Sequence, residues 1–310
     1  MILVPARLGL VGCGRLAEVG YVPAAGLTPT VEFVAFADPE AERRDLLAGA
    51  EARAHATAEE LIEAGEIDGL VVASPPDTHE GVAELAASAG LPCLVEKPPA
   101  PDLEGARRLA ALEPAPYVGF NRRFSLGRGL RDGLPEGGTI ELQLNYRRFS
   151  WAPLEVRDPA LLDLAPHLVD LALRAGLGAP RSLAATSPRP ERVRIDITGE
   201  RGRARIACAC DRFHRERVVV RDAEGEVVER RAVGGLVRGV AQRLRPGPHP
   251  LVASLAAQLA TFASAVRGGS PGELATAEDG ARVMAVIACA ARSLALGGER
   301  VDCAEGAVPL

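Results

Sequence analysis

The first 120 residues alternate short, almost wholly apolar runs with segments of helical period. The apolar runs are the expected strands, at residues 7–11, 31–37, 55–57, 67–73, 92–95 and 117–120. Apolar residues recur at helical spacing between them, at 40–47, 58–64, 79–88 and 102–112, and Asp102 is placed to cap the last of these helices. Strands that are apolar throughout and separated by helices predict a doubly wound parallel sheet covered on both faces.

The rest of the chain has a different pattern, in which apolar and polar residues alternate. This period predicts half-exposed strands at residues 139–148, 182–186, 193–198, 204–210, 218–222 and 227–231. Helices are expected at 158–175, with Asp158 as cap and Pro159 in the first position, at 251–267 and at 277–296, and a loop at 234–250. We therefore expect two domains, residues 1–121 and an α+β domain at 122–310 with a large, mostly antiparallel open sheet.

Composition narrows the class of protein. A chain of 310 residues with 47% apolar and 25% charged residues fits a folded two-domain protein. The net charge of -5 gives no electrostatic case for a nucleic-acid partner, and no apolar run is long enough to span a membrane. The six cysteines lack zinc-type spacing, so no metal is expected. We interpret them as buried thiols of a cytoplasmic protein.

Lys97 is the only lysine among the 36 basic residues, and all the others are arginine. Such a bias indicates that arginine replaces lysine wherever charge alone matters. Arginine stays protonated at any working pH, whereas a lysine can give up a proton. A lysine kept under this bias is therefore a candidate for proton transfer.

A glycine-rich turn, Gly12-x-Gly14-x-x-Ala17, joins the first strand to a helix. Gly12 permits the tight turn, and Gly14 lets the backbone approach a pyrophosphate. Asp38 ends the next strand, where a carboxylate binds a ribose diol and repels a 2′-phosphate. The pattern predicts a dinucleotide site and favours NAD; NADP stays open because Arg43 and Arg44 lie close by in the sequence.

Two further sets of residues carry candidate chemistry. Glu96-Lys97-Pro98 ends the fifth strand, and ligands of open α/β sheets bind at the carboxyl ends of strands. An ammonium there can stabilise a developing alkoxide and relay a proton. Asp163 and His167 are four positions apart and would share one face of a helix, where a neutral histidine can accept a proton from an alcohol. The alternatives for this pair are a helix cap with a structural histidine, and a metal pair.

Taken together, these residues resemble the Gfo/Idh/MocA family of oxidoreductases. The resemblance covers roughly residues 7–295. It rests on the segments 12–17, Asp38, 74–79 (Ser-Pro-Pro-Asp-Thr-His), 96–98, 119–124 (Gly-Phe-Asn-Arg-Arg-Phe), 163–170, Phe262 and 276–280. The family combines a Rossmann domain with an α/β domain whose open sheet often forms a dimer or tetramer interface. The resemblance thus implies an NAD(P)-binding domain at 1–121 and a substrate-binding and oligomerisation domain at 122–310.

The resemblance also implies roles for single residues. Lys97 and His167 would be the acid–base pair of hydride transfer with a sugar, cyclitol or related secondary alcohol, and Asp163 would lie beside them. Residues expected to contact the cofactor are Gly12, Gly14, Arg15, Leu16, Asp38, Ser74, Pro75, His79, Glu96 and Asn121. Substrate contacts are expected from Lys97, Arg123, Asp163 and His167.

Two alternatives and one departure from the family remain. The same fold can hold NAD tightly for a redox-neutral glycosidase or lyase reaction, or serve a ligand-sensing regulator without catalysis. Many family members have a glycine-rich run before the aspartate matched by Asp163, where this chain has Arg157-Asp158-Pro159-Ala160. Arg157 is therefore a candidate partner for an acidic group on the substrate, and a solvated loop arginine is its alternative.

Overall fold

The computed structural model describes residues 4–146, 158–234 and 248–303. By its internal contacts the chain forms two compact units. The first contains Met1–Phe124 and Pro248–Ala281, and the second contains Ser125–Gly247 and Arg282–Leu310. The predicted division had a single boundary after Asn121. The observed division differs because the segment Pro248–Ala281 packs with the N-terminal part of the chain. The functional roles expected for the two parts of the chain stay predictions.

The sheet of the first unit has the strand order of a Rossmann fold. Its strands are β1 (Ala6–Val11), β2 (Val31–Ala37), β3 (Arg53–His55), β4 (Gly69–Val72), β5 (Cys93–Val95), β6 (Tyr117–Val118) and β13 (Ala275–Thr276). They run in the order β13-β6-β5-β4-β1-β2-β3, and all pairs are parallel except β13 with β6. All four residues of β4 are buried, as expected for a strand covered on both faces. The predicted parallel sheet is confirmed.

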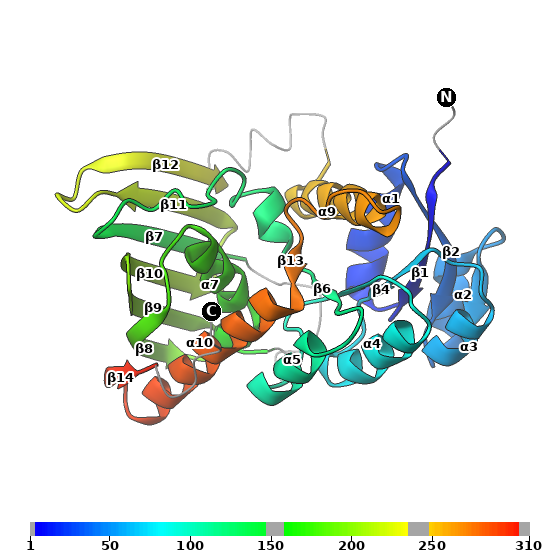
Figure 1. The fold of residues 1–310 in the computed structure, drawn as a ribbon, viewed down its shortest axis with the longest axis horizontal. Coiled ribbons are helices and arrows are strands. Elements are labelled where there is room, and N and C mark those ends of the chain that lie inside the picture. The colour runs from blue at the N-terminus through cyan, green and yellow to red at the C-terminus, as the bar shows by residue number, and fades with distance from the viewer. Residues whose placement is uncertain (1–3, 147–157, 235–247, 304–310) are drawn as a thin grey trace. The chain divides into compact units, whose positions relative to one another are not determined.

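The helices of the first unit are η1 (Ala17–Tyr21), α1 (Val22–Gly26), α2 (Ala41–Ala48), α3 (Ala58–Glu63), η2 (Pro76–Thr78), α4 (His79–Ser88), α5 (Leu103–Ala110), η3 (Asn121–Phe124) and α9 (Pro250–Val266). Asp102 caps α5 as predicted, because its side chain accepts the N–H of Gly105 at 2.8 Å. Helix α9 packs against η1, α1 and η3, and Figure 1 shows it beside α1. Its Leu255, Leu259 and Phe262 are fully buried in the core of this unit.

The second unit contains the larger, mostly antiparallel sheet. Its strands are β7 (Gly138–Asn145), β8 (Pro180–Arg189), β9 (Arg192–Gly199), β10 (Gly202–Ala209), β11 (Arg215–Arg221), β12 (Val227–Gly234) and β14 (Val301–Asp302). Their order is β12-β11-β7-β10-β9-β8-β14, and only β7 and β10 are parallel (Figure 1). Alternate residues Val193, Ile195 and Ile197 are buried, whereas the exposed Arg194 belongs to the opposite face. The predicted α+β unit is confirmed.

The prediction of one long helix over residues 158–175 is wrong in detail. The structure has two helices, α6 (Ala160–Asp163) and α7 (Ala165–Arg174), and α6 has Pro159 as its N-cap. The helix breaks at Leu164, two residues before Pro166. Proline has no N–H to donate to the preceding turn, so the hydrogen bonds of a continuous helix are interrupted ahead of Pro166. Asp163 and His167 thus lie on two consecutive helices, joined by Leu164, whose backbone keeps a helical conformation with φ -107° and ψ -36°.

The described helices of the second unit also include α10 (Ala277–Ala295), in which the division between the two units falls. In the described part of the chain, no helix is both long and apolar enough to cross a membrane. Most of the loop predicted at 234–250 and of the segment 151–158, including Arg157, lies outside the described residues.

Candidate active site

The glycine turn after β1 touches the end of the neighbouring strand β4. Gly12 has φ 90°, and a Cβ built on it would lie 2.4 Å from the backbone nitrogen of Ser74. Only glycine fits such a contact at a positive φ. The N–H of Gly12 donates to the carbonyl of Ala37 at 2.8 Å, so three strand ends meet at this turn. Strands β1 and β4 flank the point where the strand order reverses, which is where open α/β sheets bind ligands.

The next part of the turn leaves room for a ligand. A Cβ on Gly14 would meet nothing within 4 Å. Leu16 is half-buried, and the exposed Arg15 forms an ion pair with Glu18 at 2.8 Å. The residues after Gly14 enter η1, so their backbone N–H groups lie at the start of a helical segment. Open space beside glycine and helix-start amides fit the pyrophosphate of a dinucleotide.

Asp38 is fixed against the same turn by two backbone amides. Its Oδ2 accepts the N–H of Cys13 at 2.8 Å, and its Oδ1 accepts the N–H of Glu40 at 2.9 Å. Each carboxylate oxygen keeps acceptor capacity for a ribose hydroxyl. Arg44 donates to the carbonyls of Asp38 and Pro39 at 3.0 and 3.2 Å, so its guanidinium is held by backbone. Arg43 is paired with Glu40 at 2.9 Å. Both arginines are thus occupied, which fits NAD better than NADP.

His79 connects the loop after β4 to the loop after β5. The ring is fully buried, with Nε2 2.9 Å from the carbonyl oxygen of Ser74 and Nδ1 3.2 Å from that of Pro99. A neutral imidazole donates through only one of its nitrogens. Burial lowers the pKa of His79, and its carbonyl partners oppose part of that shift. His79 therefore links the two loops by hydrogen bonds. Contact of His79 or of the exposed Pro75 with the cofactor stays a prediction.

We expect His79 to make the fold less stable in acid. Its pKa is lower in the folded than in the unfolded chain, so the unfolded chain binds the proton first as the pH falls through about 6.5. The free-energy advantage of wild type over His79→Gln should then shrink by up to about 1.4 kcal/mol per pH unit. Urea unfolding at neutral and acid pH measures it. The non-titrating control Val82→Ala, on the same helix α4, should show a pH-independent loss, and a constant His79→Gln difference would refute this role.

Lys97 lies two residues after the end of β5, and the Lys97–Pro98 peptide bond is cis. Its side chain is half-exposed, whereas that of its neighbour Glu96 is buried. Glu96 Oε2 accepts the backbone N–H of Lys97 at 3.0 Å, and Oε1 accepts the hydroxyl of Tyr21 at 2.6 Å. Both Glu96 oxygens thus have partners within the first unit. Contact of Glu96 with the cofactor stays a prediction.

Asn121 and Arg123 lie on η3 and are both buried. Asn121 donates from Nδ2 to the hydroxyl of Ser254 at 3.2 Å, and its Oδ1 has no hydrogen-bond partner among the described residues. A buried acceptor without a partner fits the carboxamide N–H of a nicotinamide. Arg123 pairs with Asp279 at 3.0 Å and donates to the carbonyl of Leu274 at 3.2 Å. These contacts hold the returning segment Pro248–Ala281, and a substrate contact of Arg123 stays a prediction.

The second unit holds the other candidate catalytic groups. Asp163 ends α6, and His167 and Asp170 lie on α7; all three are at most 6% exposed. Cys210 donates its thiol to Asp163 Oδ2 at 3.6 Å. Among residues 4–146, 158–234 and 248–303, no three His, Cys, Asp or Glu side chains come together as a metal site.

The first unit therefore unites the turn, Asp38, the 74–79 loop, Lys97 and Asn121, and the second holds Asp163 and His167. Sequence reasoning missed Tyr21 and Gln258, which are fully buried and linked to Glu96. The one available signal for Gln258 is a polar residue within the apolar segment 251–267.

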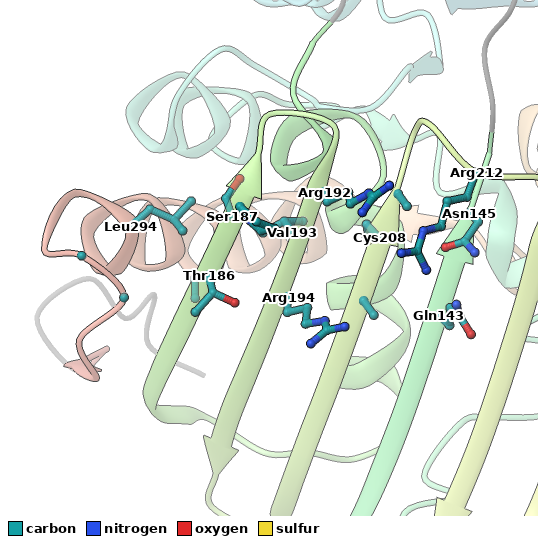
Figure 2. A pocket seen from close by; sticks show the side chains of 16 residues that line it. Gln143, Asn145, Thr186, Ser187, Arg192, Val193, Arg194, Cys208, Arg212 and Leu294 are labelled. Carbon is teal, nitrogen blue, oxygen red and sulfur yellow. The ribbon is translucent and has the colours of Figure 1, made fainter.

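A hollow of about 570 Å³ lies along β7–β10 of the second unit, and none of the candidate site residues is among those that line it. Figure 2 shows its polar lining, to which Gln143, Asn145, Arg192, Arg194 and Arg212 contribute. Arg192 is already paired with Asp211 at 2.7 Å. The hollow thus has no acid–base group in place for the predicted chemistry.

Comparison with known proteins agrees with the fold of the first unit. Residues 6–116 match the family GFO_IDH_MocA, described as an oxidoreductase family with an NAD-binding Rossmann fold. Residues 6–116, which all lie in the first unit, thus resemble the Gfo/Idh/MocA family.

Individual relatives match part of the chain. The chain is 46% identical over 123 residues to the rhizopine catabolism protein MocA of Rhizobium meliloti, an alignment covering 38% of each chain. It is 32% identical over 209 residues to the D-apiose dehydrogenase of Paraburkholderia graminis, covering 62% of this chain and 54% of that one. The chain thus spans about two fifths to a half of the length of these curated relatives.

The fold is matched over nearly the whole chain. The myo-inositol dehydrogenase from Lactobacillus casei, solved in complex with NAD(H) and myo-inositol, has a TM-score of 0.80. Sequence identity is 19%, and the match covers 99% of both chains. At this identity the likeness establishes the two-part fold alone.

Proposed function

We propose that this protein is an NAD-dependent oxidoreductase that transfers a hydride between the nicotinamide and a secondary alcohol or ketone. The substrate would be a sugar, a cyclitol or a related polyhydroxylated compound. One observation carries the proposal: the only lysine of the chain lies two residues after the end of β5, in the same unit as the glycine turn and Asp38. The family match of residues 6–116 supports the choice of NAD.

The first unit would hold the cofactor through groups already described. Amides near Gly14 would receive the pyrophosphate, Asp38 the ribose hydroxyls, and Asn121 Oδ1 the carboxamide. When bound, the nicotinamide supplies a hydride acceptor or donor at its C4. Lys97 would hydrogen-bond the reacting oxygen of the substrate and hold the charge that develops there.

The second unit would complete the acid–base chemistry. A neutral His167 would accept the hydroxyl proton as the alcohol is oxidised and return it in the reverse direction. Asp163, buried beside the thiol of Cys210, would bind a substrate hydroxyl and orient His167. This pairing of Lys97 with His167 and Asp163 is inferred from chemistry and family resemblance.

The substrate class rests on the relatives' names. D-apiose is a sugar and myo-inositol a cyclitol, and both names belong to dehydrogenases that this chain resembles. We also propose a homodimer or homotetramer formed through the second sheet. Its face carries charges of both signs, as in the pairs of Arg221 with Glu141 at 3.3 Å and Arg300 with Asp196 at 3.5 Å. A cytoplasmic location is proposed because all six cysteines are free thiols.

A substrate panel tests the proposal. Purified protein is mixed with NAD or NADP and with sugars, inositols and their keto forms, and NADH absorbance is followed. We expect turnover with NAD on at least one polyol, and at least about tenfold weaker use of NADP, because Asp38 repels a 2′-phosphate. Substrate conversion without net NADH would favour the redox-neutral enzyme. Ligand binding without any conversion would favour the regulator.

A further inference from the structure

A buried polar chain connects the backbone of Lys97 to helix α9. The carboxyl of Glu96 receives two hydrogen bonds, from the hydroxyl of Tyr21 at 2.6 Å and from the N–H of Lys97 at 3.0 Å. The Nε2 of Gln258, on α9, donates to the Tyr21 hydroxyl oxygen at 3.3 Å. The chain therefore runs Gln258, Tyr21, Glu96, Lys97 and lies wholly within the first unit.

The chain has little freedom to rearrange. Tyr21 and Gln258 are fully buried, and Glu96 is 6% exposed. A Cβ on Gly119 would lie 3.1 Å from the Glu96 carboxyl, so the end of β6 closes the space on another side. The carboxyl is thus enclosed by η1, the end of β5 and the end of β6, and Gln258 of α9 contacts Tyr21.

Burying a carboxyl costs folding free energy unless its oxygens accept well-formed hydrogen bonds. Core packing alone would be served better by an apolar residue. Burial raises the pKa of Glu96, while the Tyr21 hydrogen bond, the charge of Lys97 and the Lys97 N–H oppose that shift. The pKa of the Glu96 carboxyl thus depends on both Tyr21 and Lys97.

We propose that Tyr21 and Gln258 are positioning residues that act on Lys97 through Glu96. Tyr21 orients the carboxyl so that its second oxygen fixes the Lys97 amide, and Gln258 orients the Tyr21 hydroxyl. The end of β5 is thereby held in the geometry that presents the Lys97 side chain to the substrate oxygen. The inference rests on the proposed function only for the role of that side chain.

The single lysine gives a direct test by NMR. Protein labelled with ¹⁵N-lysine has only one labelled backbone amide, that of Lys97. Because this N–H donates to Glu96, its proton shift should follow the ionisation of the Glu96 carboxyl as the pH is varied. In Tyr21→Phe the carboxyl loses a donor, so we expect the titration midpoint to rise by about one pH unit.

Tyr117→Phe is the matched control. It removes the same hydroxyl from a tyrosine on β6 of the same unit, and the Lys97 signal should titrate as in wild type. Gln258→Met, which keeps the size of the side chain, should move the midpoint in the same direction by a smaller amount. It also keeps the test valid if Tyr21→Phe fails to fold. If the midpoint followed by the Lys97 backbone amide signal is unchanged in the folded variants, the proposal is overturned.

Kinetics supply a second readout. Tyr21→Phe should lower kcat roughly tenfold and leave the KM for NAD unchanged, because only the presentation of the Lys97 side chain is altered. A fall in kcat accompanied by a rise in the KM for NAD would mean a general loss of structure and count against the proposal. Absence of turnover in wild type would defeat the proposed function while leaving the NMR test intact.

Discussion

Replacing Lys97 by alanine is expected to lower turnover by a factor on the order of 10² or more, the usual contribution of a positioned acid–base group. Lys97 lies two residues after the end of β5 and is half-exposed, so its side chain is not part of the core, and the fold should be retained. NAD affinity, measured by calorimetry, should stay within about threefold of wild type, because the turn and Asp38 are untouched. Steady-state rates of NADH formation measure the effect.

Lys97→Arg separates proton transfer from charge. Arginine keeps the positive charge but does not release a proton at working pH, so this variant should be nearly as slow as Lys97→Ala. Arg108→Ala is the control, since it removes a cation from the surface of the same unit, where Arg108 is paired with Glu80. That variant should keep the wild-type rate. A fully active Lys97→Arg enzyme would leave charge stabilisation as the only role of the lysine.

The two glycines of the turn are expected to respond in opposite ways to alanine. Gly12→Ala places a Cβ 2.4 Å from the backbone of Ser74 and requires φ near 90°. Because both penalties fall on rigid backbone, we expect a loss of more than about 2 kcal/mol in unfolding free energy, or no folding. Thermal and urea unfolding measure it.

Gly14→Ala is both the companion variant and the control. Its Cβ meets nothing within 4 Å, so stability should stay within about 0.5 kcal/mol of wild type. The methyl group would occupy the space in which we expect the pyrophosphate, so NAD affinity should fall at least about tenfold. Wild-type NAD affinity in Gly14→Ala would show that the dinucleotide does not approach this part of the turn.

The first sheet could be predicted from the sequence because its strands are buried on both faces and appear as unbroken apolar runs. Residues 31–37 and 79–88 were predicted with the same bounds as β2 and α4. Asp38 followed from the end of β2, and Lys97 from the end of β5. Each of these inferences used a local pattern together with the rule that ligands bind at strand carboxyl ends.

What escaped prediction depends on contacts between distant residues. The return of Pro248–Ala281 to the first unit depends on α9 packing against η1, which no local pattern records. Tyr21 and Glu96 are 75 residues apart, and Gln258 is 237 residues from Tyr21. The helix break at Leu164 had a local signal in Pro166, which the apolar period of the segment concealed.

Deuterium transfer tests the central claim most directly. A polyol that gives turnover in the panel is prepared with deuterium on the carbon that bears the reacting hydroxyl, and the reduced cofactor is analysed by mass spectrometry. Hydride transfer predicts NADH that carries one deuterium on the nicotinamide ring, formed by wild type and nearly absent with Lys97→Ala. Product formed without deuterium in the cofactor, or no reduced cofactor from any polyol in the panel, would contradict the account.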